Sequence, residues 1–160
     1  MLIRFIIIIL LFFTLIGSSY SAATTGGSTK SNYDKAALLI KAAKKLEIKG
    51  KDKRAKKRYE RALKFLIKSN KDKPNQADTL NYLGFATRKL GDFEKGEEYY
   101  LLGLQIDPNH VGINEYLGEL YVATNRMDLA KERLSILEKC NCKEYNQLKG
   151  VIDGSKKSKY

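Results

Sequence analysis

The second half of the chain repeats itself at a spacing of 34 residues, and this period limits the possible folds more than any other feature. Pro74-Asn75 returns as Pro108-Asn109, and Tyr82-Leu83-Gly84 returns as Tyr116-Leu117-Gly118. Small residues recur in three copies, at Ala62, Gly96 and Ala130. Turn residues, small residues and large apolar residues therefore return together, which indicates a stack of similar units.

Each unit has the pattern of two amphipathic helices. Between Ala77 and Leu90 the apolar positions recur at intervals of three and four residues, as Leu80, Leu83, Thr87 and Leu90. The segment from Phe93 to Ile106 is predicted to form the second helix of the same unit. We expect this helix to bury Phe93, Gly96, Tyr100 and Leu104 against the first.

The residues between the helices fit tight turns. Gly91 and its counterpart Asn125 both tolerate the left-handed backbone that ends many helices. Asp92 then offers a side-chain oxygen that can cap the second helix. Asp107-Pro108 stops that helix, because proline disfavours helical geometry in the residue before it.

Two glycines inside the predicted helices indicate close helix contacts. A glycine in a helix costs about 1 kcal/mol relative to alanine, so its presence needs a reason. We expect Gly84 to lie opposite Gly96, and Gly118 to lie opposite Ala130, where two helices approach closely.

These features together resemble the tetratricopeptide repeat family, and in particular small exported proteins of the bacterial type. The resemblance covers roughly Tyr33 to Ile152 and is carried by Leu83-Gly84, Tyr100, Asp107-Pro108-Asn109, Leu117-Gly118, Tyr121 and Ala130. Four positions depart from the family pattern: Thr87 replaces an aromatic residue, Gly96 and Gly103 replace alanine, and Cys142 replaces the terminal proline.

The first hairpin matches the pattern least well. Ala62 and Pro74 fit the register, but Lys49 and Lys53 fall where leucine and tyrosine or threonine are expected. We interpret it as a divergent repeat with a longer loop. Its helices are predicted at about 33–47 and 53–69, with Ala36, Ile40, Ala43, Leu46, Ala55, Tyr59, Ala62, Leu66 and Ile67 turned inward.

The resemblance implies an all-α fold, a right-handed superhelical stack of about three helix-turn-helix repeats with a short C-terminal capping helix. The cap is needed because a solenoid end must be covered to stay soluble. The predicted segments are a divergent basic hairpin at 33–76, repeats at 77–110 and 111–142, a capping helix at 143–152 and a disordered tail at 153–160.

The N-terminal segment has the pattern of a secretory signal peptide. A positive start at Arg4 precedes an apolar run from Phe5 to Ile16, and small polar residues follow. The run is shorter than the roughly 20 residues that span a membrane. We predict a signal peptide at 1–23, cut after Ser21 or Ala23, and a flexible leader at 24–32; an uncleaved anchor is the alternative. The protein is therefore expected to be exported, to a periplasmic or extracellular location.

The net charge of +12 is concentrated in one hairpin and in the C-terminal tail. From Asp78 to Glu138 acidic residues outnumber basic ones. The basic patch consists of Lys51, Lys53, Arg54, Lys56, Lys57, Arg58, Arg61, Lys64 and Lys68. It is either a solvated helix face or an electrostatic tether to an anionic membrane or an acidic partner. Aromatic residues for base stacking are missing apart from Tyr59, so nucleic acid is not an expected partner.

The residue inventory does not predict an enzyme. His110 is the single histidine and falls in a turn, where a solvent-exposed position is the simplest interpretation. Catalysis needs a nucleophile, base or metal in mutual reach. No phosphate-binding glycine loop and no second histidine for a zinc site are present in the sequence. We therefore expect no catalytic residues, no metal and no cofactor.

Cys140 and Cys142 allow three interpretations. Two cysteines in an exported protein commonly pair, and a bridge here would close a very small ring. The pair could also remain as free or intermolecular thiols, or act as a redox-active dithiol. The first interpretation agrees with the resemblance to small exported repeat proteins that carry a cysteine pair before their last helix.

The resemblance also implies where a partner binds. In this family the first helix of each repeat lines a concave groove, which binds an extended peptide or a partner helix of another protein. Carried over to this sequence, the groove residues are Asn81, Phe85, Arg88, Glu115, Glu119 and Val122. The expected function is therefore a non-enzymatic protein-interaction module.

Overall fold

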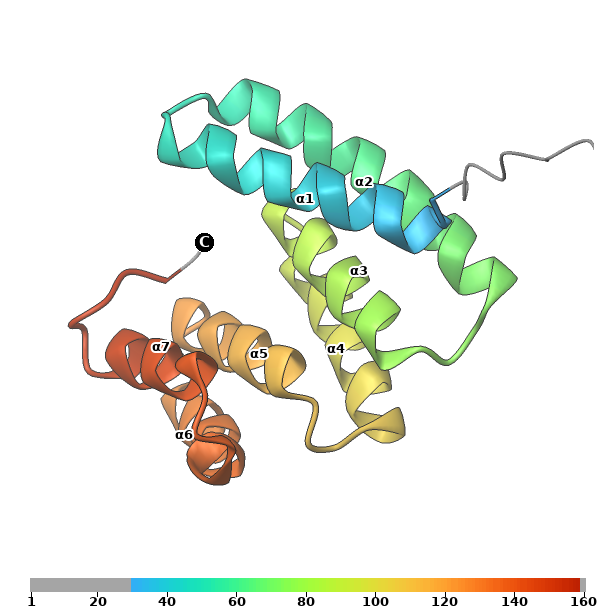
Figure 1. Cartoon of the computed structure of the whole chain (residues 1–160). Helices are drawn as coiled ribbons and strands as arrows, with labels where there is room; N and C mark the ends of the chain where they lie inside the picture. Colours follow the sequence, from blue (N-terminus) through green and yellow to red (C-terminus); the bar gives the residue numbers. More distant parts are fainter. Residues whose placement is uncertain (1–29, 159–160) are drawn as a thin grey trace, which may run out of the picture.

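The computed structural model describes residues 30–158, which form an all-α array of paired antiparallel helices (Figure 1). The predicted signal peptide and the leader up to residue 29 lie outside the described residues. The helices are α1 (Asn32–Ile48), α2 (Asp52–Asp72), α3 (Ala77–Lys89), α4 (Phe93–Ile106), α5 (Val111–Ala123), α6 (Met127–Leu137), the short 3-10 helix η1 (Glu138–Cys140) and α7 (Lys143–Ile152).

The helices pack as successive hairpins. Helix α1 packs along α2, α3 along α4, and α5 along α6, while α7 covers the last pair by contacting α5 and α6. Figure 1 shows the three hairpins following one another, with α7 at the end of the array. Among the described residues no helix is both long enough and apolar enough to cross a membrane.

Helix α1 begins earlier than the predicted leader allows. Ser31 is its N-cap: the Ser31 hydroxyl accepts a hydrogen bond from the Asp34 amide, and the Asp34 carboxylate accepts one from the Ser31 amide. This reciprocal pair satisfies two amides that the first turn of the helix leaves without partners. The last two residues of the predicted leader therefore belong to the start of the fold.

The predicted turns are confirmed. Gly91 and Asn125 have φ values of 102° and 59°, in the left-handed region. The Asp92 carboxylate then accepts a hydrogen bond from the amide of Lys95, at 3.0 Å, and caps α4. Because these conformations depend on neighbouring residues only, sequence pattern predicts them well.

The contact between Gly84 and Gly96 is also confirmed. A Cβ atom at Gly84 would lie 2.6 Å from the Tyr100 ring and 2.9 Å from the Gly96 carbonyl oxygen. At Gly118 the three atoms nearest to an added Cβ belong to Leu148 of α7, so this glycine makes room for the capping helix, and its approach to Ala130 stays a prediction. Helix α6 packs along α5 as α4 packs along α3, and α7 adds a further contact to α5.

Two residues predicted to be inward are not. Phe93 is 40 % exposed and Ile67 is 54 % exposed, although both fit an apolar stripe. Phe93 is the first residue of α4, beyond the region that α3 covers. Ile67 follows the buried Leu66, so it lies past the edge of the stripe that α1 and α3 cover. The other predicted positions are buried or half-buried.

The segment after α7 has a defined path, whereas the sequence predicts a disordered tail. The chain turns at Gly154, where φ is 78°, and the Lys156 amide donates a hydrogen bond to the Gly150 carbonyl at 2.8 Å. The described part, Asp153–Ser158, therefore folds back onto α7. We call this segment the C-terminal tail.

Candidate functional site

The first helix of each hairpin contributes to a common surface, and Lys44 of α1 contacts residues of both α3 and α5 there. The Lys44 ammonium donates a hydrogen bond to the Tyr116 hydroxyl of α5 at 2.9 Å. The same ammonium lies 4.2 Å from the centroid of the Phe85 ring on α3, a favourable cation–π distance. We call the surface formed by α1, α3, α5 and α7 the inner face.

Three aromatic rings pack together beneath the inner face. Phe85 lies between Tyr59 and Tyr116, with ring centroids 5.8 Å and 4.9 Å away, and it has no exposed surface. Such tilted and edge-to-face pairs stabilise a core beyond the area that they bury. Phe85 therefore acts as a core residue that joins the hairpins, with its upper surface covered by Lys44.

Arg88 is buried in the same region. Its guanidinium Nη1 donates a hydrogen bond to the backbone carbonyl of Tyr116 at 2.6 Å. Burial lowers the pKa of Arg88 to about 9, while the charges of Tyr100 and Glu119 act in the opposite direction. The side chain remains a cation at neutral pH and connects α3 to α5 inside the stack.

Two acidic residues of α5 are buried on the same side. Glu119 has no exposed surface, and its two carboxylate oxygens accept hydrogen bonds from Gln147 of α7 and from Ser158 of the C-terminal tail, at 3.2 Å and 2.9 Å. Glu115 is buried one turn earlier. Helix α7 and the C-terminal tail thus cover the part of α5 that the resemblance assigns to a partner.

The structure corrects the predicted groove residues. Asn81, Phe85, Arg88, Glu115 and Glu119 are buried, and only Val122 keeps partial exposure. The physical reason is the close approach of the inner helices: a Cβ at Gly112 of α5 would lie 2.7 Å from the Asn81 amide nitrogen of α3. Five of the six side chains therefore fill space between helices and do not form an accessible surface.

Two hollows on the inner face meet at Lys44. One, of about 320 Å³, lies between α1 and α3 and is lined by Ala37, Leu38, Ile40, Lys41, Lys44 and Tyr82. The other, of about 860 Å³, is lined by Lys44, Glu47, Ile48, Asp52, Lys89, Lys157 and Ser158. Both apolar and charged groups line them.

Two of the charged side chains in the larger hollow, Glu47 and Lys89, form an ion pair with each other. The Lys89 ammonium lies 2.7 Å from the Glu47 carboxylate, and the Tyr59 hydroxyl donates a hydrogen bond to the same carboxylate at 2.9 Å. Burial and this hydrogen bond raise the pKa of Tyr59 above its ordinary range. The sequence pattern does not reveal the pairing of Lys89 with Glu47, because the two residues come from different hairpins.

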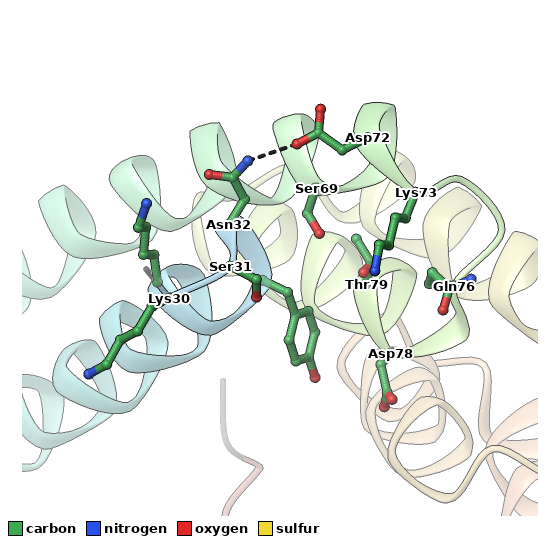
Figure 2. Close-up of a pocket in the computed structure, with 11 residues that line it drawn as sticks. Lys30, Ser31, Asn32, Ser69, Asp72, Lys73, Gln76, Asp78 and Thr79 are labelled. Atoms are coloured by element: carbon green, nitrogen blue, oxygen red, sulfur yellow. Dashed lines mark hydrogen bonds between the residues drawn. The ribbon is translucent and has the colours of Figure 1, made fainter. Parts of the chain in front are cut away.

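A third hollow, of about 430 Å³, lies where the N-termini of α1 and α3 meet the C-terminal end of α2 (Figure 2). The Asn32 amide donates a hydrogen bond to the Asp72 carboxylate at 2.9 Å and closes one side. Tyr33 stacks on Tyr82 with ring centroids 5.6 Å apart. The lining mixes both charge signs, from Lys30, Lys35, Lys73, Asp72 and Asp78. It extends the accessible surface along α1, and sequence reasoning missed it.

The basic patch of α2 lies at the surface. Eight of its nine side chains are exposed and Arg58 is half-exposed. Among residues 30–158 no carboxylate lies within ion-pair distance of any of the nine. The patch therefore presents its charge to solvent, on the hairpin that also lines the inner face.

His110 has a structural role that the sequence does not indicate. Its Nδ1 atom accepts a hydrogen bond from the Ile113 amide at 3.1 Å and caps α5. Its Nε2 atom lies 3.1 Å from the Asp78 carboxylate of α3. The side chain is mostly buried, so the prediction of a solvent-exposed turn histidine is wrong.

The two cysteines lie at disulfide distance, with their Cα atoms 5.1 Å apart. Asn141 between them has a φ of 46°, which lets the chain reverse from η1 into α7. This geometry agrees with a structural bridge, the first of the three interpretations. In the part of the chain that the structure describes, no group of three or more histidine, cysteine or acidic side chains is placed to hold a metal ion.

Comparison with known proteins supports the fold alone. The structure is similar to a solved structure described as the first TPR of Spaghetti (RPAP3) bound to the HSP90 peptide SRMEEVD. The TM-score is 0.53 and the sequence identity 20 %, over 78 % of this chain and 95 % of the other. No protein-family model and no curated protein matches the sequence. The chain therefore has a tetratricopeptide-like helical repeat fold.

Proposed function

We propose that this protein is an exported, non-enzymatic interaction module that binds an extended segment of a partner protein along the inner face. The observation that carries the proposal is the continuity of the two inner hollows at Lys44, between the first hairpin and α3. The Lys44 ammonium also donates to the Tyr116 hydroxyl of α5, so the third hairpin supports this point from below the surface. The likeness to a repeat domain bound to a peptide gives independent support.

Most of the predicted groove residues are buried, so they are poor probes of partner binding. Substituting Phe85 or Arg88 would remove buried contacts and destabilise the stack, so a loss of binding would report on stability as well as on the surface. Accessible residues of the smaller hollow are better probes. Lys41 lines it and is exposed, whereas Lys45, one turn later in the same helix, is exposed and lines none of the three hollows described.

Selection from a displayed peptide library, with the full chain as bait, tests this proposal. The affinity of selected peptides should change about tenfold on Lys41→Glu, because charge reversal in the hollow weakens the binding of acidic segments and strengthens that of basic ones. The same substitution at Lys45 should leave the affinity nearly unchanged. If both substitutions have equal effects, or if no peptide is selected, the proposal that the inner face binds a partner segment is wrong.

Export is part of the proposal and has its own measurement. The sequence pattern predicts cleavage after Ser21 or Ala23. Intact-mass measurement of the protein recovered from its native compartment should therefore lack the first 21 or 23 residues. Recovery of the full-length mass would favour the uncleaved anchor instead.

A second candidate function is electrostatic attachment to an anionic membrane through the basic patch, favoured by the exposure of these side chains without ion-pair partners. Co-sedimentation with vesicles containing anionic lipid should weaken steeply with salt, since charge attraction is screened within about 10 Å at 0.1 M. Lys56→Glu with Lys64→Glu should reduce it, whereas the same change at exposed Lys131 and Lys149 should have less effect. Binding that ignores salt rejects this candidate.

The third alternative, a thiol redox protein, depends on Cys140 and Cys142. Equilibration of the full chain with thiol buffers followed by thiol counting would reveal a reversible couple if one exists. A pair that stays oxidised throughout the accessible range would leave the bridge with a structural role only.

A further inference from the structure

The C-terminal tail is held against α7 by several independent contacts. The Lys156 amide donates to the Gly150 carbonyl, and the Lys156 ammonium donates to the Asn146 carbonyl at 3.0 Å. The stem of Lys156 lies so close that a Cβ at Gly150 would be 2.7 Å from its Cδ atom. Ser155 donates its amide hydrogen to Asp153 at 2.9 Å and shapes the reversal. These contacts direct the following residues toward the inner face.

The end of the tail contacts the inner face through Glu119. The Ser158 hydroxyl donates to one carboxylate oxygen of Glu119 at 2.9 Å. Gln147 bridges both partners, since its Nε2 donates to the other oxygen of Glu119 at 3.2 Å and to the Lys157 carbonyl at 3.3 Å. An extended backbone segment is thus recognised by its hydroxyl group and by its carbonyl, as a bound peptide would be.

The tail also closes one wall of the larger hollow. Lys157 and Ser158 line this hollow together with Lys44 and Lys89 of the inner face. Figure 1 shows the chain after α7 running back toward the first hairpin. A polypeptide lying along the full inner face would have to occupy the space that these two residues fill.

The charges around the hollow determine which segment fits there. Lys89 is paired with Glu47, and Lys44 is bound to Tyr116 and Phe85. Asp52 and Lys157 of the tail line the same hollow, and the acidic Glu119 accepts its tail hydrogen bond from Ser158. Removing the tail takes a donor from a fully buried carboxylate, which is costly unless another donor replaces it.

We propose that the C-terminal tail is an intramolecular ligand of the inner face, and that the partner segment which displaces it is basic and carries hydroxyl or ammonium donors. This inference rests on the proposed function, because it names the chemistry of the segment that the inner face binds. A tethered ligand competes at a high effective concentration, so the tail lowers the apparent affinity for any segment that must occupy the space that Lys157 and Ser158 fill.

The test uses a fluorescein-labelled peptide with the sequence of residues 153–160 and fluorescence anisotropy. The wild-type chain is compared with a full-length variant whose tail lacks its contacts: Ser155→Gly, Lys156→Gly and Ser158→Gly. The peptide should bind the variant about tenfold more tightly, as expected if the tail occupies about nine-tenths of the wild-type molecules. A peptide with glutamate at each lysine should bind the variant more weakly than the basic one.

Glu119→Gln, added to the variant with the three glycine substitutions, should lower the affinity for the basic peptide about tenfold. The reason is that the lost charge weakens a charge-assisted hydrogen bond. Glu138→Gln, at an exposed position, is the matched control. In the wild-type chain, hydrogen exchange of the Lys156 amide should accelerate when the peptide is added, and this readout does not depend on any variant folding.

Equal affinities of the two chains, a preference for the acidic peptide, or a Lys156 amide that exchanges freely without peptide would each overturn the inference. Library peptides that bind the inner face equally well in both chains would overturn it and leave the proposed function standing. Failure of every peptide to bind the inner face in either chain would remove the proposed function, and this inference with it.

Discussion

The guanidinium of Arg88 donates a hydrogen bond to the backbone carbonyl of Tyr116, 2.6 Å away, and so joins the second hairpin to the third. Arg88 is 2 % exposed, so this bond lies inside the stack. A residue expected to meet a partner instead holds the repeats together.

Truncation of Arg88 should therefore destabilise the protein. Arg88→Ala leaves a buried carbonyl without this donor and opens a cavity, at a cost of about 3 kcal/mol. Arg61→Ala, at an exposed position of α2, should cost less than about 0.5 kcal/mol. Urea denaturation followed by circular dichroism measures both. Equal midpoints for the two variants would contradict the assigned role.

Gly84 and Gly103 both lie inside helices, but replacing each by alanine should change the stability of the protein by different amounts. At Gly84 the new Cβ would meet the Tyr100 ring and the Gly96 backbone oxygen, which cannot move independently of α4. Overpacking of this kind costs about 1–3 kcal/mol. At Gly103 the nearest atom is the end of the Ile113 side chain, which can rotate away.

Alanine also favours helix over glycine by about 1 kcal/mol, and this gain offsets the smaller clash at Gly103. Gly84→Ala should thus lower the thermal midpoint, and Gly103→Ala should change it little. A scanning-calorimetry comparison decides the matter, and a larger effect at Gly103 would show that the helix contact is not the reason for Gly84.

His110 should contribute as a helix cap and as a link between hairpins. Because its Nδ1 accepts from the Ile113 amide, its Nε2 carries the hydrogen and donates to Asp78. His110→Ala should cost about 1 kcal/mol, the usual value for a lost N-cap, and His110→Asn should recover most of it. Hydrogen exchange of the Ile113 amide reports on the cap directly: faster exchange is expected in the alanine variant only.

Alkaline pH should destabilise the protein through its buried tyrosines. Burial raises the pKa of Tyr59, Tyr100 and Tyr116 above the ordinary value, so the folded state keeps protons that the unfolded state releases. Stability is therefore fully present below pH 10 and is lost above it, by about 1.4 kcal/mol per pH unit for each such tyrosine. The lowered pKa of Arg88 has the opposite sign but is a single group.

Tyr100→Phe isolates one of these contributions. No hydrogen-bond partner of the Tyr100 hydroxyl is found among the described residues, so its removal should be nearly neutral at pH 7. Above pH 10 the variant should lose stability less steeply than the wild type. Urea midpoints measured from pH 7 to pH 11 test this, and parallel curves would contradict the assignment.

Sequence pattern predicted those features that depend on neighbouring residues. The turns at Gly91 and Asn125, the cap at Asp92 and the close contact of Gly84 with Gly96 are each encoded within one repeat. A period of 34 residues then implies that similar hairpins stack. Phe93 shows the limit of this reasoning, because helical spacing does not say how far the neighbouring helix extends.

The candidate site could be predicted only in outline. The sequence identified the helices that line the inner face, but not which of their side chains remain accessible. Lys44, which joins three hairpins, carried no signal apart from its place in a lysine-rich helix. The contact of Ser158 with Glu119 joins residues far apart in the chain, and composition alone favoured a disordered tail.

Local backbone preference, helical periodicity and the repeat were thus determined by the sequence itself, because short-range sterics and the spacing of apolar residues act within one hairpin. The burial of Phe85, Arg88 and Glu119 was decided only by the tertiary structure. It depends on the separation between hairpins, on the position of α7 and on the return of the C-terminal tail. These distances arise from the packing of the whole stack, which no single repeat contains.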